Sequence, residues 1–215
     1  MEHVRQLADW DCGLACVEMV MRWIYRHLQE PLPRDIRKRI QSVIQSESIW
    51  TVDLATYLVD EFDTTSSVDV WFASNVMHVN PVHQAHPFYH AEFAADVARV
   101  GPKYTAWQAR GAVPRHVPCS ELMQRMKDRP SALIVLVDAS RLTCCVWGQR
   151  ARQTGFQGHF IVVVDIVQED GNVVVHYVDS ASDQHTRCRM DGHTFDVARC
   201  SPDTDEDLIL VSVSR

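Results

Sequence analysis

Cys12 is the residue of this sequence whose surroundings most favour nucleophilic chemistry. It lies in the segment Gln6-Leu7-Ala8-Asp9-Trp10-Asp11-Cys12-Gly13, where a loop leads into a predicted long helix. Unpaired backbone N–H groups and the positive end of the helix dipole face such a position. Both favour a thiolate, which is the reactive form of cysteine. Gly13 has no side chain, and we expect this to let a substrate carbonyl approach the sulfur.

A cysteine nucleophile requires a base, and His159 is the best candidate. It stands at the start of a predicted buried strand, and Asp179 stands at the end of the next one. A hairpin of these two strands would place both residues at the same end of a sheet. Asp179 would then hold one imidazole nitrogen and leave the other facing sulfur, as a thiolate–imidazolium pair requires. Asp165 and Asp183 are rival candidates for the orienting acid.

Gln6 lies six residues before Cys12 and is a candidate for stabilising negative charge. Its side-chain amide could point at the same spot as the Cys12 backbone N–H. Two donors there would form an oxyanion hole, in which losing one donor typically costs about 3 kcal/mol of transition-state stabilisation. The predicted catalytic set is therefore Cys12 as nucleophile, His159 as base, Asp179 as orienting acid and Gln6 as oxyanion donor.

Helical periodicity dominates the first half of the chain. Apolar residues recur there at intervals of three and four, as on the buried face of a helix, and prolines end the first such segment. The predicted helices are Gly13–Gln29, Arg34–Gln45, Thr51–Phe62, Phe88–Val100 and Ser120–Lys127, with a long loop at Asn75–Pro87.

Strand signals dominate the second half. Several runs are continuously apolar, which is typical of strands buried on both faces, and Asp170-Gly171-Asn172 is a hairpin turn signal. The predicted strands are Val68–Phe72, Ala132–Val137, Phe160–Val164, Asn172–Val178 and Leu208–Val213. Helices first and strands later indicate an α+β fold with N-terminal helices packed on an antiparallel sheet.

Composition narrows the function classes. The 215 residues are 46% hydrophobic and 23% charged, which predicts one globular domain spanning 1–215. A net charge of -7 argues against a nucleic-acid partner, because phosphate contacts need clustered Lys and Arg. The densest basic stretch, Arg34–Arg39, is interpreted as a solvated helix face.

We expect no membrane partner and a cytoplasmic or nuclear location. The N-terminus lacks the apolar core of a secretion signal, and no apolar run approaches the roughly 18 residues that span a bilayer. Thiols stay reduced in those compartments. The seven cysteines are odd in number and irregularly spaced, so a disulfide framework is not expected.

Other residues with suitable side chains are interpreted as structural. Cys16 is expected in the core, and Trp50 and Asp53 are expected to cap or pack the third helix. The acidic stretch 203–207 is expected to be solvated. The remaining histidines and cysteines are interpreted as scattered rather than as zinc ligands, so no metal and no cofactor is predicted; they are His83, His86, His90, Cys119, Cys144 and Cys145.

Four segments resemble one known family, the guanylyl cyclase domain-containing proteins of animals and their plant relatives. They are Trp10–Cys16, Ser48–Ala55, Phe156–Ile161 and Thr204–Asp207, and their order and spacing agree over nearly the whole chain. The segment from Gln6 to Cys16 is also similar to the bacteriocin-processing peptidase domains. Those domains have a papain-like fold and use Cys, His and Asp in that order.

The two resemblances imply different activities. The peptidase domains imply a papain-like cysteine hydrolase, whereas the family name implies conversion of GTP to cyclic GMP. A cyclase needs carboxylates that hold metal ions, and a chain of charge -7 repels GTP at long range. The short cyclase-centre pattern proposed in plants is approached only loosely, at Lys103-Tyr104-Thr105. Relatives commonly have Asn and Pro near the third catalytic position, where this chain reads Val178-Asp179-Ser180.

The sequence therefore predicts a papain-like cysteine hydrolase that cleaves peptide or isopeptide bonds in a protein or peptide substrate. A guanylyl cyclase and a non-catalytic interaction module with the same fold are the alternatives. The sequence leaves the oligomeric state and the scissile bond open.

Overall fold

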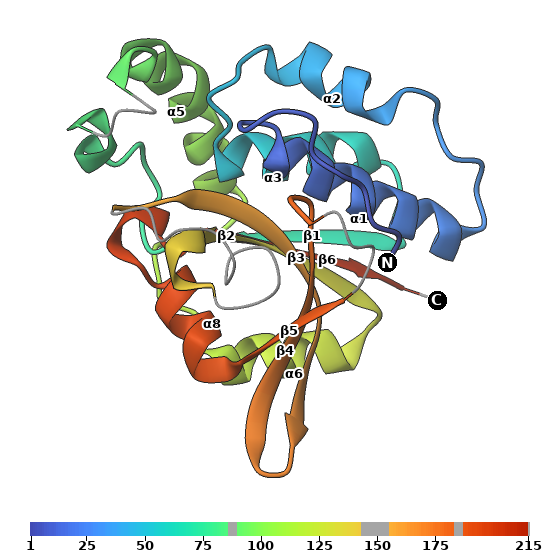
Figure 1. Ribbon diagram of the computed structural model, residues 1–215. Helices are drawn as coiled ribbons and strands as arrows, with labels where there is room; N and C mark the ends of the chain where they lie inside the picture. Colours follow the sequence, from blue (N-terminus) through green and yellow to red (C-terminus); the bar gives the residue numbers. More distant parts are fainter. Residues whose placement is uncertain (86–89, 143–154, 183–186, 215) are drawn as a thin grey trace.

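The computed structural model describes residues 1–85, 90–142, 155–182 and 187–214. Its elements confirm the predicted α+β class (Figure 1). The helices of the described residues are α1 (Cys12–Leu28), α2 (Ile36–Ile44), α3 (Thr51–Phe62), α5 (Phe93–Ala109), α6 (Cys119–Asp128) and α8 (Gly192–Arg199). Short 3₁₀ turns follow at η1 (Pro81–Ala85), η2 (Ala139–Arg141) and η3 (Pro202–Thr204).

A six-stranded sheet of order β1-β6-β2-β3-β4-β5 forms the centre of the molecule. All of its neighbouring strands are antiparallel. The strands are β1 (Val68–Ala73), β2 (Ser131–Asp138), β3 (Gly158–Glu169), β4 (Asn172–Asp179), β5 (Cys188–Asp191) and β6 (Leu208–Val213). The β3–β4 hairpin turns at Asp170 and Gly171, both with positive φ, as the sequence signal predicted.

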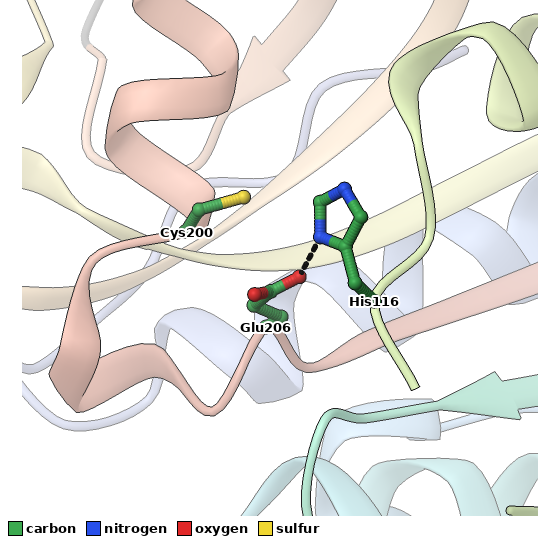
Figure 2. Close-up of side chains that lie close together, drawn as sticks. All are labelled: His116, Cys200 and Glu206. Atoms are coloured by element: carbon green, nitrogen blue, oxygen red, sulfur yellow. Dashed lines mark hydrogen bonds and ion pairs between the residues drawn. The ribbon is translucent and has the colours of Figure 1, made fainter. Parts of the chain in front are cut away.

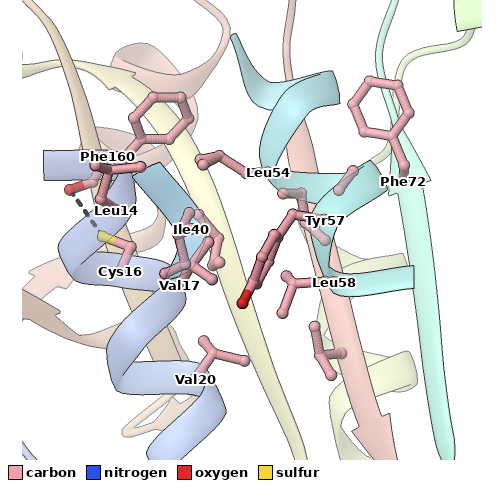
Figure 3. Close-up of a cluster of buried hydrophobic side chains, with 14 of the residues drawn as sticks. Leu14, Cys16, Val17, Val20, Ile40, Leu54, Tyr57, Leu58, Phe72 and Phe160 are labelled. Carbon is pink, nitrogen blue, oxygen red and sulfur yellow. Dashed lines mark hydrogen bonds between the residues drawn. The ribbon is translucent and has the colours of Figure 1, made fainter. Parts of the chain in front are cut away.

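Helices cover both faces of this sheet (Figure 1). On one face α1 packs on β3 and α3 packs on β1, and on the other α6 and α8 pack on β2, β3 and β4. Two apolar cores result, one under α1 and α3 (Figure 3) and one under α6 and α8. The continuous apolar run of β2 is explained by this double burial, since consecutive residues such as Ile134 and Val135 face different cores.

The end of α5 and the last third of the chain differ from the prediction. The predicted helix Phe88–Val100 begins partly outside the described residues, and α5 continues past Pro102 to Ala109. The lost proline hydrogen bond is tolerated because Tyr104 and Trp107 pack against Phe72. Elements β5 and α8 were not predicted, because β5 has only 4 residues and carries a weak alternation signal.

Among the described residues no helix combines the length and apolar character needed to cross a membrane. The cysteines that the structure describes, at positions 12, 16, 119, 188 and 200, are all free thiols. Cys144 and Cys145 lie outside the described residues.

Candidate active site

Helix α1 places Cys12 over the start of β3. Cys12 is the first residue of α1 and is 7% exposed, so it is largely buried. One turn later, Cys16 donates its S–H to the Phe160 carbonyl over 3.3 Å (Figure 3). Because Phe160 follows His159 directly, this bond fixes the helix register beside the predicted base. Cys16 is fully buried, which confirms its prediction as a core residue.

Gly13 has a different role from the one predicted. A Cβ atom at this position would lie 2.9 Å from the Leu54 side chain and 3.1 Å from that of Phe160. Both contacts are closer than side chains normally approach, so the missing side chain would point into the core rather than toward a substrate. Gly13 therefore allows α1 to pack tightly on α3 and β3, and the expectation that it clears a path for substrate is wrong.

His159 and Asp179 form a buried hydrogen-bonded pair. The Nε2 atom of His159 lies 2.8 Å from Oδ1 of Asp179, and the two residues are 4% and 1% exposed. Burial by itself lowers the pKa of His159, but the charge and hydrogen bond of Asp179, together with Cys12, raise it to about 10. Cys12 interacts with the same imidazole and adds to this upward shift. The imidazole is therefore a cation at neutral pH.

The turn after β4 fixes the orientation of Asp179. Its Oδ1 also accepts the Ala181 backbone N–H at 2.8 Å, and its carbonyl oxygen lies 3.0 Å from Nε2 of His3. Of the rival acids, Asp165 is exposed on β3 and Asp183 lies outside the described residues. Asp179 is thus the carboxylate that the fold brings to His159.

Gln6 lies beside the same turn. Its backbone N–H donates to the Ser180 carbonyl at 3.0 Å, and its side-chain oxygen accepts the Ser180 hydroxyl at 3.1 Å. One N–H of its amide donates to the Ala8 carbonyl at 3.0 Å. An amide NH₂ carries two donors, so the oxyanion role would require the second one.

Asp11 and Arg37 shape the loop before Cys12, and sequence reasoning missed both. The Asp11 carboxylate accepts the backbone N–H groups of Leu7 and Ala8 at 2.9 and 3.0 Å. Arg37 binds that carboxylate at 2.6 Å and also binds Glu18 at 3.0 Å. The side chain of Arg37 is only 15% exposed, so the expectation that 34–39 is entirely a solvated face is wrong for this residue.

Asp138, which the sequence analysis did not single out, fixes the backbone that leads to His159. It ends β2 and is buried, and its Oδ1 accepts the backbone N–H groups of Ser140 and Gln157 at 3.0 and 3.2 Å. The Ala139 N–H donates to the Gln157 carbonyl at 2.8 Å. The chain therefore enters β3 with a fixed path two residues before His159. A signal was available, because an Asp directly after an apolar strand commonly binds nearby backbone.

The segment from Ser48 to Ala55 forms a separate charged cluster. The Asp53 carboxylate accepts the Trp50 backbone N–H at 3.2 Å, which agrees with the predicted capping role. It also binds Arg99 and, at 2.5 Å, Lys103. Arg99 further binds Asp96 at 2.7 Å, and Asp96 is buried. This cluster ties α3 to α5.

The loosely matched cyclase pattern lies inside α5 and is used structurally. Lys103 pairs with Asp53, Tyr104 is 2% exposed, and the Thr105 hydroxyl donates to the Gly101 carbonyl at 3.3 Å. None of these three side chains is arranged to hold a nucleotide phosphate.

The acidic segment Asp203–Asp207 is folded into the molecule, so the expectation that it is solvated is wrong. Asp205 and Asp207 are each 4% exposed. Asp205 binds the buried His83 at 2.7 Å. His86 lies outside the described residues, and His90 is exposed.

Comparison with known proteins places these features in one family. The family profile described as guanylylate cyclase matches residues 1–211, which includes every side chain of the site above. A protein of Arabidopsis thaliana named "Guanylyl cyclase 1" is 29% identical over 223 residues, covering 99% of this chain and 76% of that protein. The predicted resemblance to this family is confirmed.

Proposed function

The chain belongs to the guanylylate cyclase family, and we propose that it acts as a papain-like thiol hydrolase on peptide or isopeptide bonds. The observation that carries the proposal is the chain of contacts from Cys12 through His159 to Asp179. These residues come from α1, β3 and β4, which are distant in sequence. Nucleophile, base and orienting acid are the three parts that such a reaction needs.

In the proposed reaction, the Cys12 sulfur attacks the substrate carbonyl carbon and forms a tetrahedral oxyanion. The imidazolium of His159 gives its proton to the departing nitrogen, so the C–N bond breaks and a thioester with Cys12 remains. His159, now neutral, takes a proton from water as that water attacks the thioester. The carboxylic acid leaves and the thiolate–imidazolium pair returns. Asp179 keeps the ring oriented throughout.

The charge state of His159 supports this direction of proton flow. An imidazole whose pKa lies near 10 is protonated before the substrate arrives, so it can act as acid at once. Gln6 and the Cys12 backbone N–H are the proposed oxyanion donors, and the contacts of Gln6 with Ser180 would hold it in place.

Guanylyl cyclase activity is the second candidate, because the family description and the name of the Arabidopsis relative point to it. The buried carboxylates of the charged cluster between α3 and α5 argue against this activity, since Asp53 and Asp96 are already neutralised by Arg99. Within the described residues, the group of three side chains suited to a metal ion contains a single carboxylate. A two-metal cyclase centre needs more than one.

The decisive experiment treats the full chain with a small electrophile and locates the adduct by mass spectrometry. Iodoacetamide suits this purpose because the sulfur of Cys12 is largely covered. We expect Cys12 to be alkylated at neutral pH much faster than Cys119, the half-buried cysteine that serves as internal control. His159→Ala should remove this advantage, because the thiolate loses its counter-ion.

Hydrolysis is then measured on mixtures of fluorescence-quenched peptide and isopeptide substrates. Cyclase activity is measured on GTP with Mg²⁺ or Mn²⁺. Turnover of an amide that disappears in Cys12→Ala supports the proposal. Equal alkylation of Cys12 and Cys119, or cyclic GMP formation that survives Cys12→Ala, would overturn it.

A further inference from the structure

Three side chains of metal-binding type meet outside the candidate active site (Figure 2). His116 comes from the segment between α5 and α6, Cys200 from the C-terminal cap of α8, and Glu206 from the turn before β6. One ligand atom from each lies within 4.8 Å of the other two. Neither the proposed reaction nor the family motifs account for this set, because His116 and Cys200 lie outside the four matched segments.

The chemistry of the three atoms suits zinc. Zn²⁺ binds imidazole nitrogen, thiolate and carboxylate oxygen, with bonds of roughly 2.0 to 2.3 Å. Nδ1 of His116 now lies 2.6 Å from Oε2 of Glu206, whereas two such ligands of a tetrahedral zinc ion lie about 3.3 Å apart. The His116 side chain is 56% exposed, so it can turn by this small amount without disturbing the core.

Cys200 and Glu206 are partly buried, and the Glu206 side chain is only 15% exposed. Asn75 reaches the other oxygen of Glu206 at 3.4 Å, as outer groups commonly do at metal-binding carboxylates.

The backbone that presents Glu206 is strained. Asp205 and Glu206 have φ of +50° and +52°, a conformation that side chains other than glycine adopt at a cost. Two successive residues of this kind mark a turn whose shape is imposed by its surroundings, and such turns concentrate at functional sites. The Glu206 N–H donates to the Thr204 hydroxyl at 3.2 Å, which helps to fix this turn.

We propose that His116, Cys200 and Glu206 bind a divalent cation of the zinc class, with water as the fourth ligand. The ion joins three segments that are far apart in the sequence. The segment of Glu206 leads directly into β6. The carbonyl of Asp207, the residue before this strand, accepts the Leu136 N–H at 3.1 Å. Leu136 pairs with Phe160 beside His159. The cation thus stabilises the end of the central strands that carries the candidate active site, whether or not that site is catalytic.

The test uses cobalt as a visible probe in the Cys12→Ser protein. This background is needed because Cys12 and His159 could bind a thiophilic metal themselves. Metal-free protein is titrated with Co²⁺, and the thiolate-to-cobalt absorption in the near ultraviolet is followed, with Zn²⁺ added last as competitor. We expect one equivalent of Co²⁺ to give this band and Zn²⁺ to remove it.

Matched variants locate the ion. Cys200→Ser and His116→Ala should abolish the band, whereas Cys119→Ser and the exposed His193→Ala should leave it intact. Asn75→Ala should weaken binding by about tenfold, since losing an outer partner of a ligand usually costs that much or more. Zn²⁺ should raise the Tm of the Cys12→Ser protein but not that of Cys12→Ser with Cys200→Ser. Absence of the thiolate band, or its persistence in Cys200→Ser, would refute the site.

Discussion

Asp179 and Asp53 are both 1% exposed, yet their partners differ in kind. Asp53 lies between Arg99 and Lys103, two cations that do not give up their protons near neutral pH. Asp179 faces His159, which in turn contacts Cys12. An imidazole can pass a proton to a neighbour, and guanidinium and ammonium groups in such pairs do not.

This difference separates a structural charge cluster from one that can do chemistry. Cys12 and His159 of one cluster and Asp53 of the other lie in segments that resemble the family, so motif membership alone does not tell the two clusters apart. The two clusters are distinguished by the type of cation that pairs with the buried carboxylate. The same criterion assigns the Asp11–Arg37 pair to structure, although it lies next to Cys12 in the chain.

Replacement of Cys12 should have the largest effect. Cys12→Ala is expected to abolish fast alkylation and any amide hydrolysis, because it removes the thiol that contacts His159. The free energy of unfolding should change by no more than about 1 kcal/mol, since one small side chain is exchanged for another. Rate measurements and urea unfolding on the same preparation provide the check.

Asp53→Asn should be the counterpart, with a large effect on stability and none on reactivity. Removing one partner of a buried ion pair leaves charge uncompensated, and the loss here should be about 3 kcal/mol because Arg99 and Lys103 retain some contact with water. Urea unfolding measures it. The alkylation rate of Cys12 should stay within twofold of the parent. A stable Asp53→Asn protein with an unreactive Cys12 would break the comparison.

The sequence predicted the residues of the candidate site better than the residues that hold them in place. Cys12, His159 and Asp179 were predicted from their places at a helix start and at strand ends, and the fold brings them together. Asp11, Arg37 and Asp138 were missed because their roles depend on long-range contacts, such as the pairing of Arg37 with a residue 26 positions away. Local periodicity contains no information about such partners.

The misplaced details have the same origin. Gly13 was assigned to substrate access, but its neighbours Leu54 and Phe160 come from α3 and β3 and decide otherwise. The acidic segment 203–207 was assigned to solvent from its composition. Its burial follows from Asp205 binding His83, 122 positions away. Elements with a clear period, including α1, α3 and β2, were predicted to within two residues.

Asp179→Asn should reduce turnover by about a hundredfold while leaving Cys12 in place. The amide can still hold the ring, but it no longer stabilises the imidazolium, and general acid–base catalysis of this kind is worth roughly 10² to 10⁴ in rate. Single-turnover hydrolysis of an activated ester and of an amide would separate thioester formation from thioester hydrolysis. An unchanged amide rate would show that Asp179 is only a turn residue.

The pH dependence of stability should reveal the His159–Asp179 pair directly. The pKa of His159 is raised from 6.5 to about 10 by Asp179 and Cys12 against the opposing effect of burial. A raised pKa gives stabilisation that is complete below pH 6.5 and lost as the pH rises through about 10. The difference in unfolding free energy between the parent and His159→Gln should therefore shrink over this range. Histidine NMR should show the same midpoint.

Asp179→Asn provides the control for that titration. Without the carboxylate the His159 midpoint should fall toward its ordinary value, whereas Asp53→Asn should leave it unchanged. A His159 midpoint that is insensitive to Asp179 would contradict the assigned pairing.

Arg37→Lys should have the smallest effect and tests whether a permanent cation is replaceable where its role is structural. Arg37 binds Asp11, Glu18 and the Arg5 carbonyl with different nitrogens, an arrangement that one ammonium group cannot reproduce. We expect a loss of about 1 kcal/mol in unfolding free energy. Arg39→Lys is the matched control, because Arg39 is 44% exposed and such surface changes stay within about 0.5 kcal/mol. If the alkylation rate of Cys12 also falls in Arg37→Lys but not in Arg39→Lys, the loop around Asp11 positions the Cys12 nucleophile in addition to stabilising the fold.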